Sequence, residues 1–354
     1  MATRAPFKTD PYQQLYAVTQ WAVPNSGDFN RETYEYSLTR LKKLSKDTWF
    51  RRWWEEPKSG GRFRVIQPAQ SFLVQPQLAI TQHLVGSIPQ ILQYDHCYSG
   101  YGVIPTVRQL NGAKTAVVLD LSEAFEHVTP ELLEKALFKW AGSGLRALSG
   151  DAIKLIVYLT TCAHPRTSKV RTPQGCVSSP YLFDLVMIDL DQALEKLFAS
   201  YRVKDAVRYS DNFCVVFEED TRMVILENFV TEVTALIKEY GFKVGTAQIH
   251  RDEPITFLGC KIYGDQIDVK DAWAEEFVEF LTSLLALPLK DPSPREYHSS
   301  VMGMYSWLKQ IYGEENIPLR FLELIIRYKV RIRKSPLKFV KLLAKQLMKK
   351  LPKF

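Results

Sequence analysis

Residues 116–121 read Ala116-Val117-Val118-Leu119-Asp120-Leu121, an apolar run with an acid near its end. Its length and its valines predict a buried strand that presents Asp120 at one end. Ninety-one residues after Asp120, Asp211 lies between two further apolar runs, 206–209 and 213–217, which predicts a hairpin with an acid at its turn. Carboxylates on neighbouring strands could hold two Mg²⁺ ions, and two metals about 3.5–4 Å apart promote in-line phosphoryl transfer.

The segments around these two acids predict a mixture of helices and strands. A turn over 55–61 leads into a strand over 62–66, and a second hairpin is expected over 257–269. Helices are expected over 75–92, from Pro130 onward, and over 179–198 and 222–240, and the chain is helical after Ala272. The pattern predicts an α+β fold with a helical C-terminal module.

Positive charge is concentrated at the C-terminal end of the sequence. The net charge is +7, yet eleven Lys and Arg residues and no acid follow Glu323, so the preceding residues carry −4. A helix over 335–351 would place an apolar stripe beside a lysine stripe made of Lys338, Lys341, Lys345 and Lys349. We expect this stripe to follow duplex phosphates. A solvated helix face and a membrane-surface helix are the alternatives.

The cysteines and the N-terminal residues favour an intracellular, cytoplasmic protein. The five cysteines are widely spaced and form no C-x-x-C pair, which argues against a disulfide scaffold and a zinc ribbon. The first residues lack the apolar run of a signal peptide, and no run of 18 apolar residues occurs, so no membrane partner is expected.

Five motifs, in order, resemble the reverse transcriptase family, closest to its non-LTR and group II intron-like members. Residues 118–128 are similar to the first catalytic motif, 172–183 to the PQGxxxSPxLF motif, and 208–212 to the YxDD box, here Tyr209-Ser210-Asp211-Asn212. Residues 57–66 are similar to the fingers hairpin, and 257–259 to the hairpin that grips the primer end. The resemblance implies a right-hand polymerase with fingers, an antiparallel palm sheet and a helical thumb. The expected boundaries are an N-terminal extension over 1–45, fingers and palm over 46–265, and a thumb over 266–354.

The resemblance also implies roles for individual residues. Asp120, Asp211 and the carbonyl of Leu121 would hold Mg²⁺ or Mn²⁺, with Asn212 beside them in the catalytic set. Arg62 and Arg64 would hold the triphosphate of a dNTP, unless they are only a solvated hairpin face. Contacts to the template, the nucleotide and the primer are implied for Gln174, Gly175, Tyr209, Leu258 and Gly259. Glycine would let its loop approach the base pair closely because it has no Cβ.

Phe125 and Asn212 bear on the choice of nucleotide. An aromatic residue five positions after the first acid excludes a 2′-hydroxyl in the resembled family, so Phe125 favours deoxynucleotides; alternatively, it is a core aromatic. Asn212 replaces the second acid of the YxDD box, which removes a charge and should shift preference toward Mn²⁺. The family usually carries a lysine that protonates the leaving pyrophosphate, and Lys243 and His250 are both candidates.

The leading interpretation is therefore a polymerase that copies an RNA template into DNA from a primer–template duplex. The first alternative is an RNA-dependent RNA polymerase of a divergent RNA virus, using rNTPs. The second is a non-catalytic RNA-binding protein that keeps only the fold.

Overall fold

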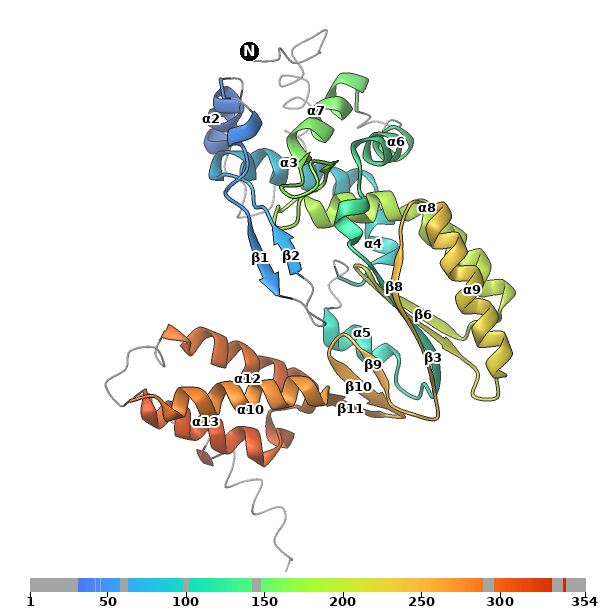
Figure 1. Cartoon of the computed structure of the whole chain (residues 1–354), viewed down its shortest axis with the longest axis vertical. Helices are drawn as coiled ribbons and strands as arrows, with labels where there is room; N and C mark the ends of the chain where they lie inside the picture. Colours follow the sequence, from blue (N-terminus) through green and yellow to red (C-terminus); the bar gives the residue numbers. More distant parts are fainter. Residues whose placement is uncertain are drawn as a thin grey trace, which may run out of the picture. The chain divides into compact units, whose positions relative to one another are not determined.

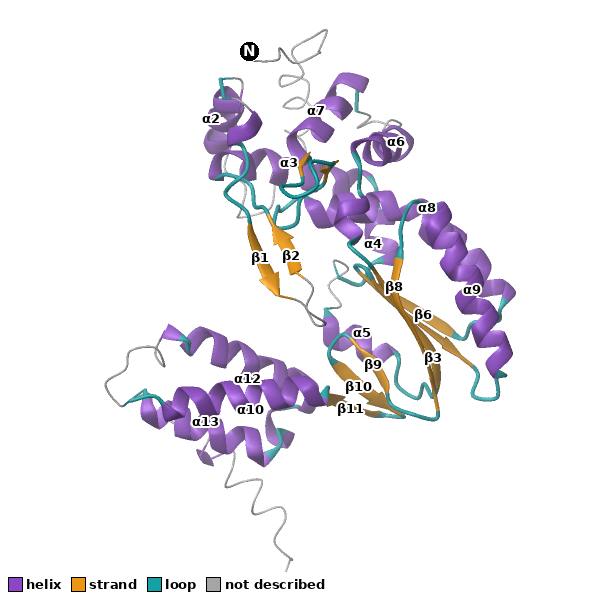
Figure 2. Ribbon diagram, viewed as in Figure 1, coloured by secondary structure: helices purple, strands orange, loops and turns teal. Residues whose placement is uncertain are grey.

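The computed structural model describes residues 31–41, 43–44, 46–57, 63–97, 102–141, 148–288, 296–332 and 340–341. The chain divides into two compact units. Unit 1 takes in residues 1–100, 119–213 and 222–248, and unit 2 takes in residues 101–118, 214–221 and 249–354. Helices and strands occur in both units (Figure 2), which confirms the expected α+β class.

Unit 1 is organised around one long helix, α8 (Ser179–Ser200), whose buried residues include Leu182, Phe183 and Leu190. Around α8 lie four contacting helices: α3 (Ser71–Ser87), α4 (Gln90–Tyr94), α6 (Pro130–Ala141) and α9 (Met223–Glu239). Two further helices extend this layer, with α2 (Arg31–Leu41) against α3 and α7 (Gly150–Thr160) against α3 and α6. The buried residues of α9 follow helical spacing, at 226, 229, 233 and 237, so each helix contributes one apolar face to a shared core.

A two-stranded hairpin of unit 1 forms where the fingers hairpin was expected. Strands β1 (Trp54–Pro57) and β2 (Phe63–Ile66) pair antiparallel, with Glu56 opposite Arg64. A second short pair, β4 (Cys162–Ala163) and β5 (Val170–Arg171), lies before the predicted PQG loop. A single 3₁₀ turn, η1 (Lys46–Thr48), precedes β1.

The central sheet has the strand order β6-β7-β3-β8. Figure 1 labels three of its strands, β3, β6 and β8. Its strands are β3 (Thr115–Leu121), β6 (Asp205–Tyr209), β7 (Asn212–Phe217) and β8 (Val244–Arg251). Val117 and Leu119 of β3 are buried. The predicted strand with Asp120 and the predicted hairpin with Asp211 at its turn therefore both form, and β3 and β7 are neighbours in one sheet.

Unit 2 combines a small sheet with helices. Strands β9 (Ile255–Phe257), β10 (Cys260–Tyr263) and β11 (Gln266–Val269) pair in the order β11-β10-β9. The helices are α5 (Val103–Gln109), α10 (Asp271–Ala286), α12 (His298–Tyr312) and α13 (Leu319–Arg331), with the 3₁₀ turn η4 (Glu314–Asn316). Phe277 of α10 packs on Phe321 of α13 with ring centroids 5.5 Å apart. Arg331 donates hydrogen bonds to the carbonyls of Leu285, Leu287 and Pro288, which satisfies carbonyls at the end of α10.

One helix differs from the sequence-based expectation. The predicted helix over 75–92 is two helices, α3 and α4, because Pro89 follows the end of α3 and cannot donate a backbone hydrogen bond. α3 also begins one turn earlier than expected, at Ser71, which buries Leu73 completely. In the described part of the chain, no helix has both the length and the apolar character that crossing a membrane requires.

Candidate active site

The two predicted metal-binding acids both lie in unit 1, Asp120 near the end of β3 and Asp211 in the turn before β7. The backbone N–H of Leu121 donates to the carbonyl of Asp211 at 3.0 Å, so the end of β3 is tied to the turn between β6 and β7. The side chains of Asp120 and Asp211 are both half-buried. The structure thus brings together the residues that the sequence placed 91 positions apart.

The turn that carries Asp211 has two residues and an unusual backbone. Ser210 has φ +55°, in the left-handed region that a residue with a Cβ adopts at a cost. The amide Nδ2 of Asn212 donates to Oδ1 of Asp211 at 2.9 Å. Asparagine therefore supplies a donor where an aspartate would place a second negative charge, and the amide orients the carboxylate beside it.

The donor set at this position fits a divalent cation that is shared with substrate. In the residues that the structure describes, no group of three or more His, Cys, Asp and Glu side chains is arranged so that it could hold a metal ion by itself. Two carboxylates with the carbonyl of Leu121 match the way in which Mg²⁺ binds through one or two carboxylates, phosphate oxygens and water. Asp120, Asp211 and Leu121 are the residues that would hold it.

The predicted PQG loop is attached to the fingers hairpin. The N–H of Gln67 donates to the carbonyl of Gln174 at 2.8 Å, next to a β-bridge between Ile66 and Gln174. Gly175 has φ +98°, and a Cβ at this residue would lie 2.9 Å from Cγ2 of Ile66. The side chain of Ile66 on β2 therefore occupies the space that a Cβ at position 175 would need. The predicted contact of this loop with a nucleotide remains a prediction.

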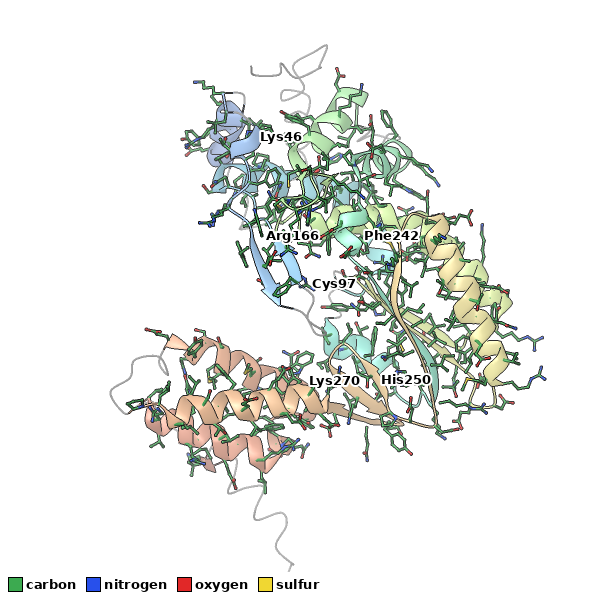
Figure 3. The ribbon with its side chains drawn as sticks, in the orientation of Figure 1. Lys46, Cys97, Arg166, Phe242, His250 and Lys270 are labelled. Atoms are coloured by element: carbon green, nitrogen blue, oxygen red, sulfur yellow. The ribbon has the colours of Figure 1, made fainter. Side chains whose placement is uncertain are left out.

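Phe125 is part of an aromatic row under the end of β3. It belongs to the 3₁₀ turn η3 (Ala124–His127), and its half-buried ring lies 5.3 Å from the ring of Phe183 on α8. Phe183 in turn packs edge-on against Phe242, with ring centroids 5.8 Å apart. Phe242 is labelled in Figure 3. The ring of Phe125 therefore packs against the core, and this contact holds it in place five positions after Asp120 in the sequence.

Of the two candidate proton donors, Lys243 is the one whose backbone is bonded close to Asp120. Its carbonyl accepts from the N–H of Ser122 at 2.8 Å, two residues after Asp120, and its side chain is exposed. Gly245 lies against the same backbone, since a Cβ there would be 3.3 Å from the carbonyl oxygen of Asp120. His250 is instead buried in unit 2 and faces Glu253, with Nδ1 3.2 Å from its carboxylate.

The predicted primer-grip residues form a tight turn in unit 2. Leu258 and Gly259 connect β9 to β10, and both have positive φ angles, +49° and +78°. Two positive φ angles are typical of a type I′ hairpin turn, in which leucine is an unfavourable residue. The contact of this turn with a primer remains a prediction.

For the remaining predicted binding residues, the structure gives the exposure of the side chains that it describes. Arg64 is exposed on β2, and Arg62 lies outside the described residues. Lys341 is exposed, whereas Lys338, Lys345 and Lys349 lie outside the described residues. Tyr209 is half-buried, and burial together with a hydrogen bond to Cys97 raises the pKa of its phenol to about 12.

Sequence reasoning missed a buried cluster of three acids and one arginine next to the turn that carries Asp211. Arg208 contacts carboxylates of all three acids, and the exposed fraction of each of the four side chains is 5% or less. We refer to these four residues as the acid–arginine cluster: Asp95, Asp184, Asp191 and Arg208. One signal was available, since Asp184 and Asp191 are seven residues apart on the apolar face of one helix.

The strand order, the paired acids and the anchored loop are the arrangement expected of the palm of a polymerase. The sequence profile described as reverse transcriptase (RNA-dependent DNA polymerase) matches residues 57–262. The chain therefore belongs to the reverse transcriptase family. This result favours RNA-directed DNA synthesis over the RNA polymerase and the non-catalytic interpretations.

Solved structures with a related arrangement include telomerases of two Candida species. Telomerase from Candida albicans, in complex with a TWJ fragment of telomeric RNA, is 13% identical with a TM-score of 0.43, over 92% of this chain and 68% of that one. Apo telomerase from Candida tropicalis is 11% identical with a TM-score of 0.42, over 90% and 69% of the two chains. A search of curated proteins found no match.

Proposed function

We propose that this chain itself catalyses RNA-directed DNA synthesis, adding deoxynucleotides to a primer 3′-hydroxyl opposite an RNA template. The observation that carries the proposal is the bond from Leu121 N–H to the carbonyl of Asp211, which ties the end of β3, where Asp120 lies, to the turn that carries Asp211. Divalent cations bound there would neutralise the phosphates and activate the attacking hydroxyl.

The chain's own residues divide the remaining work. Asp120 and Asp211 supply oxygen ligands, and the amide of Asn212 keeps one oxygen of Asp211 engaged. The ring of Phe125, held by Phe183, would lie under the sugar and exclude a 2′-hydroxyl. Lys243, anchored by its backbone next to Ser122, is the better placed donor of a proton to pyrophosphate.

The direct test is incorporation of labelled nucleotides by the purified chain on a primed homopolymer RNA. The assay offers dNTPs or rNTPs, with Mg²⁺ or Mn²⁺. We expect dNTP incorporation, and its loss in Asp120→Ala and Asp211→Ala. Incorporation of rNTPs alone would overturn the proposal in favour of an RNA polymerase, and template binding without any incorporation would favour a binding protein.

A matched control separates loss of a catalytic acid from loss of any turn carboxylate. Asp265 is the second residue of the two-residue turn between β10 and β11, as Asp211 is between β6 and β7, and its side chain is exposed. Asp265→Ala should keep wild-type activity. Equal losses in Asp211→Ala and Asp265→Ala would refute the assignment of Asp211.

A further inference from the structure

The acid–arginine cluster is assembled from three segments that are far apart in the sequence. Asp184 and Asp191 come from α8, Arg208 from the end of β6, and Asp95 from the segment after α4. Arg208 Nη1 lies 2.7 Å from Asp184 and 3.2 Å from Asp95. Nε and Nη2 of Arg208 bind the two oxygens of Asp191 at 3.0 and 2.8 Å, the bidentate geometry in which a guanidinium is held most firmly.

Burial and Arg208 act in opposite directions on the acids of the cluster. Burial raises the pKa of the Asp184 carboxyl well above its usual value, whereas the neighbouring guanidinium of Arg208 lowers it. Arg208 is therefore the group that stabilises negative charge in this buried site.

The same groups reach the catalytic turn directly. The N–H of Ser210 donates to both oxygens of Asp95, at 3.0 and 3.1 Å. The carbonyl of Ser210 accepts from Nη1 of Arg208 at 3.1 Å. Both backbone polar groups of the residue before Asp211 are thus held by buried charged side chains, and this residue is the one with φ +55°.

We infer that the acid–arginine cluster is a positioning device that holds the Ser210 turn in its left-handed conformation and so directs Asp211 toward Asp120. This inference rests on the proposed function, because it concerns the same site. It also ties the turn to α8, the helix that begins directly after the PQG loop. Arg208 and the three acids would act through the turn without touching substrate.

The first experiment measures the turn itself. Hydrogen–deuterium exchange of peptides covering 205–217 is compared between wild type and Asp191→Asn, which replaces one partner of the bidentate pair by a donor. The control is Asp189→Asn on the same helix, because Asp189 instead binds Lys139 and the indole of Trp140, at 2.8 and 3.1 Å. We expect faster exchange of the turn peptides in Asp191→Asn alone.

The second experiment measures catalysis by the same variants under single-nucleotide addition. A misdirected Asp211 should lower kcat by about tenfold or more and raise the Mg²⁺ concentration for half-maximal rate. The KM for dNTP and the affinity for primer–template should change by less than about threefold, since no binding group is removed. Should Asp191→Asn not fold, Asp95→Asn tests the same turn by weakening the acceptor of Ser210 N–H.

Two results would overturn the inference. The first is hydrogen–deuterium exchange of the turn peptides in Asp191→Asn or Asp95→Asn at the wild-type rate. The second is a kcat of these variants that equals the kcat of Asp189→Asn. A wild-type chain that incorporates no nucleotide would instead refute the proposed function, while the exchange experiment would still decide the role of the cluster. A wild-type chain that polymerises, with variants that also do, would refute only this inference.

Discussion

Replacing Gly175 by alanine tests whether the PQG loop depends on its contact with the fingers hairpin. The added Cβ would lie 2.9 Å from Cγ2 of Ile66 and 3.5 Å from the backbone nitrogen of Pro68. The backbone, with φ +98°, is also one that residues with a Cβ rarely adopt. Such strain costs about 1–3 kcal/mol, and forcing a methyl group into a packed site costs about 1–3 kcal/mol more.

We therefore expect Gly175→Ala to lower the free energy of unfolding by about 2–6 kcal/mol. Urea denaturation followed by circular dichroism measures this change. Gly112→Ala is the matched control, because Gly112 has φ +82° with no atom within 4 Å of the added Cβ. Gly112→Ala should lower the free energy of unfolding only by the cost of the backbone conformation.

A double-mutant cycle isolates the steric part. Ile66→Ala removes the Cγ2 atom, so the double variant should recover about 1 kcal/mol or more relative to the sum of the single changes. In the polymerase assay, Gly175→Ala should raise the KM for dNTP, because Gln174 shifts with its neighbour. The reasoning is refuted if Gly175→Ala costs no more than Gly112→Ala, or if the cycle gives no coupling.

Three further predictions address the acids and the aromatic ring. Asn212→Asp replaces the donor to Asp211 by a second carboxylate, and like charges repel without a cation. In EDTA the variant should therefore have a lower melting temperature than wild type, and added Mg²⁺ should raise its melting temperature by more. An equal rise in the two proteins would contradict this prediction. Phe125→Ala should raise the ratio of rNTP to dNTP incorporation, and an unchanged ratio would leave the ring as a core residue. Burial raises the pKa of Asp191 from 3.8 to about 6, so the folded chain keeps a proton that the unfolded chain has lost. The free energy of unfolding should therefore fall as pH rises from about 4 to about 6, by on the order of 3 kcal/mol from this group. In urea denaturation, the free energy of unfolding of Asp191→Asn should lack that part of the pH dependence. A pH profile identical to that of wild type would contradict the assignment to Asp191.

The features that sequence predicted well depend on local rules. The run from Ala116 to Leu119 has the length and side chains of a buried strand, and the residues on either side of Asp211 have the pattern of a hairpin. Both elements form as expected. The family resemblance then added the order of the motifs, which a single pair of acids does not provide.

The features that sequence missed depend on contacts between distant segments. Nothing near Asp95 in the chain points to Ser210, and the partner of Asp184 and Asp191 is known only once β6 lies against α8. The same holds for Gly175, whose neighbour Ile66 is more than a hundred positions away. Pairing of this kind follows from the tertiary fold, whereas periodicity reports only which face of an element is buried.

The charge composition of the acid–arginine cluster limits how this protein can change over generations. Three buried carboxyl groups contact one buried guanidinium. Replacing Arg208 alone would leave these carboxyl groups without their counter-charge, which is among the most damaging kinds of substitution. Positions 184, 191 and 208 should therefore drift as a set. Relatives that carry an apolar residue at position 208 should also have neutral residues at 184 and 191, and ancestral intermediates that lack only the arginine should fold poorly.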